Sequence, residues 1–306
     1  MKRMTGLIVV LYILFCLSAA HAEERQIGLI RAEQTGNIRQ TTAGSARIVG
    51  KMREKEFYPC FEKTDGWYLI CDPNGVKGYV SEKLCTFYSI PDPLNQDNDL
   101  FKDDQYRELE TGDLVHFGHF EQNNNASDGA EPIEWIVLNV NKTEKRMLLI
   151  SRYGIDCQHY HLSNNPVVWE NSGLRKWLND PFYQTAFEKE ERDRILPSYL
   201  KADPNPEYNV KCGGDTTDHV FLLSIAEVQR YMKAEFLPCR PTIYTIVHNG
   251  SYNINTGGSW WWLRTAGHDR MHTSYVNDDG EISAYGYGVI SNRGVVRPAI
   301  WISIAD

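Results

Sequence analysis

The sequence predicts a mainly β chain built from two units, a small β-barrel over residues 27–88 and a larger α+β domain over residues 111–304. Two observations give this fold class. In the first unit, short apolar stretches alternate with turn residues and none has a helical period, which is typical of short strands. In the second unit, hairpin patterns are followed by segments of helical spacing and then by an aromatic, glycine-rich region.

The N-terminus has the order of a secretory signal peptide over residues 1–22. Two basic residues precede an apolar run over residues 7–17, and Ala20 and Ala22 are small residues suited to cleavage. The run is shorter than the roughly 20 residues that cross a bilayer, and an uncleaved anchor is the alternative interpretation. We therefore expect a secreted or cell-envelope-associated, extracytoplasmic protein with no transmembrane segment after signal cleavage.

The charge balance narrows the partners. The formal net charge is -8, and loss of Lys2 and Arg3 with the signal peptide would leave -10. An acidic chain without a basic patch repels nucleic acid and anionic membrane surfaces. We expect partners among cell-wall peptides, glycans and surface proteins, and no nucleic acid.

Cysteine usage permits disulfides. Six cysteines follow the signal peptide, at positions 60, 71, 85, 157, 212 and 239. None forms a C-x-x-C pair, so neither a zinc ribbon nor a thioredoxin-type site is indicated. Asp65-Gly66 is a strong two-residue hairpin signal, and a regular hairpin around it would place Cys60 opposite Cys71. This register makes the pair a candidate disulfide, although sequence alone does not choose among the 15 pairings that six cysteines allow.

The first unit resembles a bacterial SH3-like (SH3b) domain. The resemblance rests on Asp65-Gly66-Trp67-Tyr68-Leu69-Ile70 and Gly75-Val76-Lys77-Gly78-Tyr79-Val80, with weaker matches at 36–39 and 48–52. It implies an SH3-like β-barrel that binds cell-wall peptide or acts as a spacer. Tyr58, Trp67 and Tyr79 are the candidates for its groove, and packing in the core is the alternative for each. An acidic, polar linker is predicted over residues 89–110.

The second unit contains clear helix starts. Ser172 is placed to cap a helix through Phe182, and Ser224 with Glu227 forms a capping box. The unit resembles an uncharacterised family of secreted bacterial domains, on motifs such as Glu134-Trp135-Ile136-Val137-Leu138, Trp262-Leu263-Arg264-Thr265 and Gly294-Val295-Val296-Arg297-Pro298. That family's fold resembles the C-type-lectin-like fold, in which the first and last strands pair. The resemblance implies that residues 113–117 lie beside residues 299–302.

The candidate ligand-binding residues lie in the aromatic region near the C-terminus. Rigid aromatic side chains on irregular loops provide contact area at low entropic cost. The candidates are Trp260, Trp261, Arg264, Tyr275, Tyr285 and Tyr287. A strand core is the alternative for the tryptophans, since three successive indoles cannot share one face. Arg264 and Arg297 are interpreted as structural, paired with acids such as Glu134 or Glu170.

Metal and cofactor signals are weak. Asp278, Asp279 and Glu281 carry the oxygen ligands that calcium prefers, but Asn277-Asp278-Asp279-Gly280 is also an ordinary turn. His159 and His161 are spaced to suit a metal, while the other histidines, including His268 and His272, show no complementary carboxylate spacing. We expect no cofactor, with calcium as the alternative, and interpret the histidines as solvated.

Catalytic motifs are missing from the sequence. Neither a G-x-S-x-G elbow nor an H-E-x-x-H motif occurs. No cysteine follows Cys239, where the formylglycine-generating relatives of the lectin-like fold carry theirs. We interpret the chain as an exported bacterial binding protein that recognises cell-wall peptide, glycan or surface-protein ligands without catalysis. The alternatives are a cell-envelope hydrolase or modifying enzyme with its site in residues 111–304, and a structural surface spacer.

Overall fold

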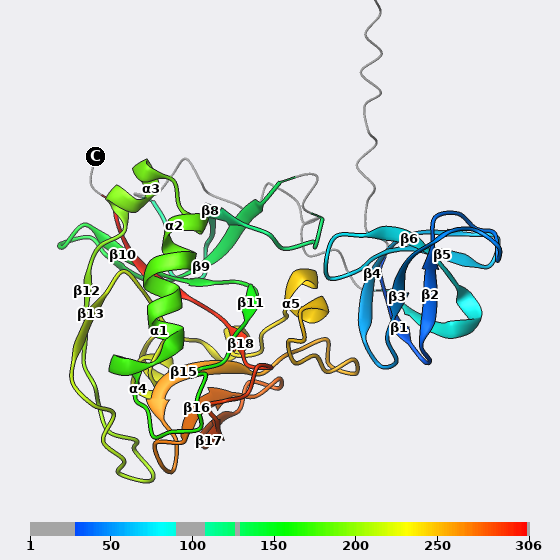
Figure 1. Cartoon of the computed structure of the whole chain (residues 1–306). Helices are drawn as coiled ribbons and strands as arrows, with labels where there is room; N and C mark the ends of the chain where they lie inside the picture. Colours follow the sequence, from blue (N-terminus) through cyan, green and yellow to red (C-terminus); the bar gives the residue numbers. More distant parts are fainter. Residues whose placement is uncertain (1–27, 90–107, 126–128, 305–306) are drawn as a thin grey trace, which may run out of the picture.

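The computed structural model describes residues 28–89, 108–125 and 129–304 (Figure 1). The chain is mainly β, with three larger sheets and short helices, as the sequence predicts. The predicted signal peptide and most of the predicted linker fall outside the described residues. No helix within those residues is long and apolar enough to cross a membrane.

The first sheet is antiparallel and has the strand order β3-β2-β6-β5-β4-β1-β7. Its strands are β1 (Gly28–Ala32), β2 (Gly36–Arg39), β3 (Ile48–Met52), β4 (Phe57–Thr64), β5 (Trp67–Cys71), β6 (Lys77–Ser81) and β7 (Cys85–Tyr88). The order leaves β3 and β7 at its two ends, so the described residues form an open sheet rather than the predicted closed barrel. The Asp65-Gly66 turn is confirmed, because Thr64 pairs with Trp67 and both turn residues have positive φ.

The predicted Cys60–Cys71 disulfide is wrong. A β-bulge at Phe61 shifts the register, so Cys60 pairs with Ile70 instead of Cys71. The shift sends the two thiols to opposite faces of the sheet: Cys60 packs with Ile30 in one apolar cluster, and Cys71 packs with Phe61 in another. All six described cysteines are free.

A second sheet of five strands has the order β14-β19-β10-β9-β8. Its strands are β8 (Leu114–Phe120), β9 (Glu131–Asn141), β10 (Arg146–Ser151), β14 (Val220–Phe221) and β19 (Ala299–Ser303). β19 pairs with β10 and β14, whereas β8 pairs with β9. The expected pairing of residues 113–117 with residues 299–302 is therefore wrong, because the β9–β10 hairpin lies between them.

A third sheet, ordered β11-β18-β15-β16-β17, carries the aromatic region. Its strands are β11 (Asp156–Cys157), β15 (Trp261–Ala266), β16 (His272–Val276), β17 (Ile282–Gly288) and β18 (Val295–Val296). A small ribbon of β12 (Ser198–Leu200) and β13 (Thr216–Asp218) stands apart from it. The second and third sheets share one large apolar core, which holds Trp135, Trp261 and Trp262 fully buried.

The helices are short. They are α1 (Gly173–Trp177), α2 (Tyr183–Ala186), α3 (Lys189–Arg194), α4 (Ile225–Tyr231) and α5 (Ile243–Val247), with a π turn over Leu178–Phe182 joining α1 to α2. Figure 1 shows α1 and α2 end to end. Both predicted caps are confirmed: Ser172 accepts a hydrogen bond from the Arg175 amide, and Ser224 and Glu227 form the capping box.

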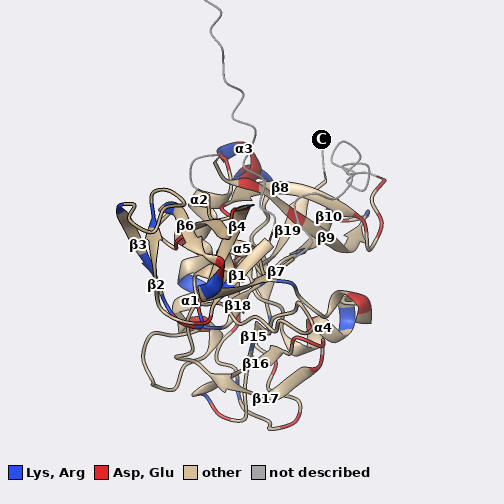
Figure 2. Ribbon diagram, turned by 90° about the vertical axis from the view of Figure 1, so that its right-hand side faces the viewer, with Lys and Arg blue, Asp and Glu red and all other residues tan. Residues whose placement is uncertain are grey.

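The first sheet touches the rest of the chain at α5. Leu29 packs against Ile243, Ile246 and Val247 in a small apolar cluster. The side-chain amide of Asn124 also donates to the Asp72 carbonyl. In the ribbon of Figure 2, acidic and basic residues lie next to one another on α3 and α4.

Candidate functional site

An aromatic groove lies where the segment before β15 meets β17. It has a volume of about 220 Å³. Its lining residues are Ser251, Tyr252, Asn253, Gly258, Ser259, Trp260, Asp278, Tyr287 and Arg293. Two of the predicted ligand-binding residues, Trp260 and Tyr287, therefore lie in one concave surface.

Strand alternation explains how the three successive tryptophans are divided. Trp260 and Trp262 lie on one side, with ring centroids 4.6 Å apart. Trp262 is fully buried beneath Trp260 and donates its indole N–H to the Gln158 carbonyl. Trp261 points to the other side, where its indole donates to the Leu237 carbonyl. Only Trp260 retains exposed surface for a ligand.

Two tyrosines pack around Trp260. The Trp260 ring centroid lies 5.0 Å from that of Tyr287 and 5.4 Å from that of Tyr275. Tyr275 and Tyr287 are edge-on to each other at 6.1 Å. These contacts restrain the rings before any ligand arrives, which lowers the entropic cost of binding.

Hydrogen bonds to Asp278 hold the polar side of the groove in place. One carboxylate oxygen of Asp278 accepts hydrogen bonds from the Asn253 side chain at 2.6 Å and from the Thr256 hydroxyl at 3.0 Å. The Ser251 and Ser259 hydroxyls bond to each other at 2.7 Å. Burial raises the pKa of Tyr252, so its hydroxyl keeps its proton and can donate. The groove thus combines an aromatic wall with hydroxyl, amide, carboxylate and guanidinium groups.

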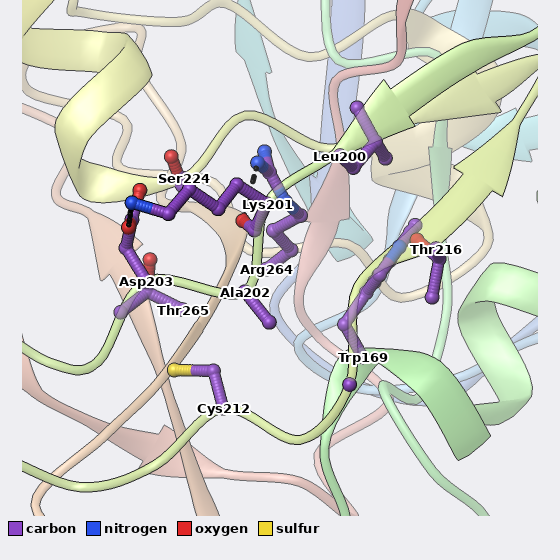
Figure 3. A pocket seen from close by; sticks show the side chains of 11 residues that line it. Trp169, Leu200, Lys201, Ala202, Asp203, Cys212, Thr216, Ser224, Arg264 and Thr265 are labelled. Carbon is purple, nitrogen blue, oxygen red and sulfur yellow. Dashed lines mark hydrogen bonds and ion pairs between the residues drawn. The ribbon is translucent and has the colours of Figure 1, made fainter.

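Arg264 is not part of the groove. Its guanidinium is 5 % exposed and pairs with the Glu227 carboxylate, at 2.9 Å for one of the two contacts. The small cavity beside it, shown in Figure 3, measures only about 10 Å³, about the space of one water molecule. The acid that pairs with Arg264 is therefore Glu227, rather than Glu134 or Glu170.

The other predicted site residues are scattered. Trp261 is fully buried, and the guanidinium of Arg297 lies 5.1 Å from its ring centre. Arg297 itself donates to backbone carbonyls of Ser151 and Phe236. Tyr285 is 56 % exposed and stacks on His268, away from Trp260.

The SH3-like candidates do not share a surface. Tyr58 is 1 % exposed, and its hydroxyl bonds to Glu56 and to the Arg53 amide, so it belongs to the core. Trp67 and Tyr79 are half-buried on the opposite face of the sheet, by the pairing of β5 with β6. The structure therefore separates Tyr58 from the other two.

The predicted calcium ligands lie in a tight turn between β16 and β17. The Asn277 amide donates to the Glu281 carbonyl, and Asp279 accepts from the Glu281 amide. Asp278 points instead to Asn253, so the carboxylates of Asp278 and Asp279 are engaged in separate contacts.

Sequence reasoning missed a cluster of His268, Asp269 and His272 in the β15–β16 turn. Their possible ligand atoms all lie within 4.8 Å of one another. Burial acts to raise the pKa of Asp269, but hydrogen bonds from His272 and the Met271 amide, with the nearby imidazoles, outweigh it and lower that pKa. The view that these histidines lack a carboxylate partner is wrong, because Asp269 follows His268 directly and the turn folds His272 onto it.

Comparison with known proteins places the groove inside a region that matches a family model. A family model described as "Domain of unknown function (DUF6273)" matches residues 144–304, just over half of the chain. The match includes β15, β16 and β17 and all residues of the groove. No curated protein and no solved structure matches the chain.

Proposed function

Because the chain belongs to the DUF6273 family, whose description assigns no function, we propose from the site itself that it is an exported glycan-binding protein. The observation that carries this proposal is the groove that Trp260 and Tyr287 line together with Asn253, Asp278 and Arg293. Aromatic faces suit the C–H faces of a sugar ring, and the polar groups suit its hydroxyls.

The shape of the groove favours a glycan over a flat protein surface. At about 220 Å³ it is small and concave, and both aromatic rings and polar groups line it. Arg293 and Tyr287 are exposed at the groove, whereas Arg264 lies outside it. An exposed aromatic groove without Arg264 supports binding rather than an envelope hydrolase centred on the Trp260–Arg264 segment.

We also propose an SH3-like fold for the first unit, a lectin-like fold for the second unit, and a location outside the cytoplasm. The confirmed Asp65-Gly66 hairpin and the antiparallel first sheet support an SH3-like unit that holds the protein to cell-wall peptide. The order of hairpin, helices and an irregular aromatic end supports a lectin-like layout for the second unit. The predicted signal peptide supports a site outside the cytoplasm.

The test is a glycan array and a panel of soluble peptidoglycan fragments, followed by calorimetric titration of any ligand that binds the full-length protein. Trp260→Ala and Tyr287→Ala should each weaken binding at least about 10-fold, which corresponds to ~1.4 kcal/mol. Tyr285→Ala is the matched control, because Tyr285 is on the same strand and similarly exposed (56 % against 48 %) but lies away from Trp260.

Arg293→Ala provides an independent variant, since Arg293 is exposed and its loss leaves the aromatic core in place. Circular dichroism checks that each variant is folded. If no glycan or peptidoglycan fragment binds, or if folded Trp260→Ala, Tyr287→Ala and Arg293→Ala all bind as wild type, the proposal is wrong.

A further inference from the structure

A histidine–carboxylate cluster lies at the β15–β16 turn, outside the groove. The nearest nitrogen of His268, Nε2, lies 3.6 Å from Asp269 Oδ2, and His272 Nδ1 lies 2.7 Å from Asp269 Oδ1. The imidazole centroids of His268 and His272 are 4.2 Å apart. Among the described residues, this is the one group of three such side chains whose possible ligand atoms converge.

The orientation of His268 is fixed by groups that would not touch a metal. Its Nδ1 lies 2.8 Å from the Tyr285 carbonyl oxygen, so Nδ1 carries the proton and donates. The ring also stacks on the Tyr285 ring, with centroids 3.8 Å apart and planes within 11°. The lone pair of Nε2 is therefore left on the Asp269 side. A backbone carbonyl holding the second ring nitrogen is the usual support of a metal-binding histidine.

Asp269 and His272 are also held in place by hydrogen bonds within the turn. Asp269 accepts a hydrogen bond from the Met271 amide at 2.8 Å, which closes the turn. His272 is the first residue of β16, and its backbone carbonyl accepts from the Gly267 amide. The three donors thus come from one short hairpin turn whose backbone is already closed.

The spacing suits a small tetrahedral ion. Ligands about 2.0–2.1 Å from zinc lie roughly 3.3 Å from one another, close to the His268–Asp269 separation. At the shorter contact the His272 Nδ1–H donates to Asp269 Oδ1, and a metal bound at Nδ1 would displace that proton into solvent. All three side chains are partly exposed, at 23 %, 48 % and 33 % for His268, Asp269 and His272, so an ion can reach them.

We propose that His268, Asp269 and His272 bind one divalent transition-metal ion of the zinc class. Two imidazoles and one carboxylate suit zinc, nickel or copper, whereas calcium requires oxygen ligands throughout. Three protein ligands leave a fourth position open to water or to a donor atom of another molecule. The site is independent of the glycan groove, since none of its ligands lines that groove.

The test is calorimetric titration of the chelator-treated full-length protein with zinc chloride, with calcium chloride in parallel. We expect one zinc ion per chain and no calcium binding at this site. His268→Gln and His272→Gln should each weaken zinc binding about 100-fold or more, since loss of a supporting contact alone costs 10–100-fold. Cobalt titration should give visible absorption bands that both variants lose.

His159→Gln is the matched control, because His159 Nδ1 also contacts a backbone carbonyl, that of Ile290, at 2.6 Å. It should leave the zinc affinity unchanged. Asp269→Asn changes an exposed side chain and serves if a histidine variant fails to fold. Absence of zinc binding would overturn the proposal. Zinc affinity equal to wild type in folded His268→Gln and His272→Gln variants would also overturn it. So would zinc binding that is lost when the cysteines are alkylated but kept in these variants.

Discussion

Asp156 is a buried carboxylate whose ionisation should work against folding. It lies in β11, is 5 % exposed, and accepts hydrogen bonds from the Cys157 amide at 2.6 Å and the Gln158 side chain at 3.3 Å. Burial raises the pKa of Asp156 to about 6, against an ordinary 3.8, and the hydrogen bonds only partly oppose this. Between pH 3.8 and about 6, the folded state therefore keeps a proton on Asp156 that the unfolded chain has already released.

Ionisation of Asp156 makes the folded state less stable as the pH rises. Below pH 3.8 both states are protonated and Asp156 has no effect on stability. As the pH rises from there through about 6, the unfolded state gains the advantage, and folding loses about 3 kcal/mol in total at 1.36 kcal/mol per pKa unit. About 2 kcal/mol of this loss falls between pH 4.5 and 7.5.

Asp156→Asn removes the charge and keeps the size of the side chain. The free energy of unfolding of the variant, minus that of wild type, should rise by about 2 kcal/mol from pH 4.5 to pH 7.5. Guanidinium unfolding followed by tryptophan fluorescence at both pH values measures this difference. Carboxyl NMR should show one aspartate titrating near pH 6 in wild type only. A free-energy difference that stays constant with pH would refute the reasoning.

Two further predictions concern packing and the thiols. Gly294→Ala should lower stability by about 3 kcal/mol or more, because a Cβ there would lie 1.8 Å from Trp262 Nε1. Gly288→Ala, whose Cβ meets nothing within 4 Å, is the control in a thermal unfolding assay, and equal melting temperatures would contradict this packing. Alkylation in denaturant without reductant should label all six cysteines from Cys60 to Cys239, because none of them is in a disulfide. Alkylation of Cys60 in the folded protein should be slow, since burial raises the pKa of its thiol to about 12. A Cys60–Cys71 linked peptide in the mass spectrum would show that the register is not the one described.

Local signals in the sequence predicted local structure well. The Asp65-Gly66 turn and the caps at Ser172 and Ser224 depend on a few adjacent residues, and all three form as predicted. The bulge at Phe61 has no such signal, because it moves side chains between two apolar faces that look alike in the sequence. One inserted residue was enough to separate Cys60 from Cys71.

The candidate site was only partly predictable for the same reason. Trp260 and Tyr287 stand out by residue type, but Tyr252 and Arg293 join them through the folding of a polar loop and a later turn. Arg264 carries an equally suggestive motif, yet it is buried against Glu227, which lies in a helix 37 residues earlier. Packing between segments that are distant in the chain decides whether such a residue is exposed or buried. This packing cannot be recognised from a single sequence.

The position of β19 constrains how the second sheet is assembled during synthesis. β19 contains Ala299–Ser303 and lies between β10 and β14, so it leaves the ribosome after both of its neighbours. Until then β10 and β14 each present an unpaired edge, and such edges pair readily with other chains. A chain stopped before Ala299 should therefore aggregate rather than fold into a smaller soluble unit, and the nascent chain depends on whatever shields those edges until β19 has been synthesised.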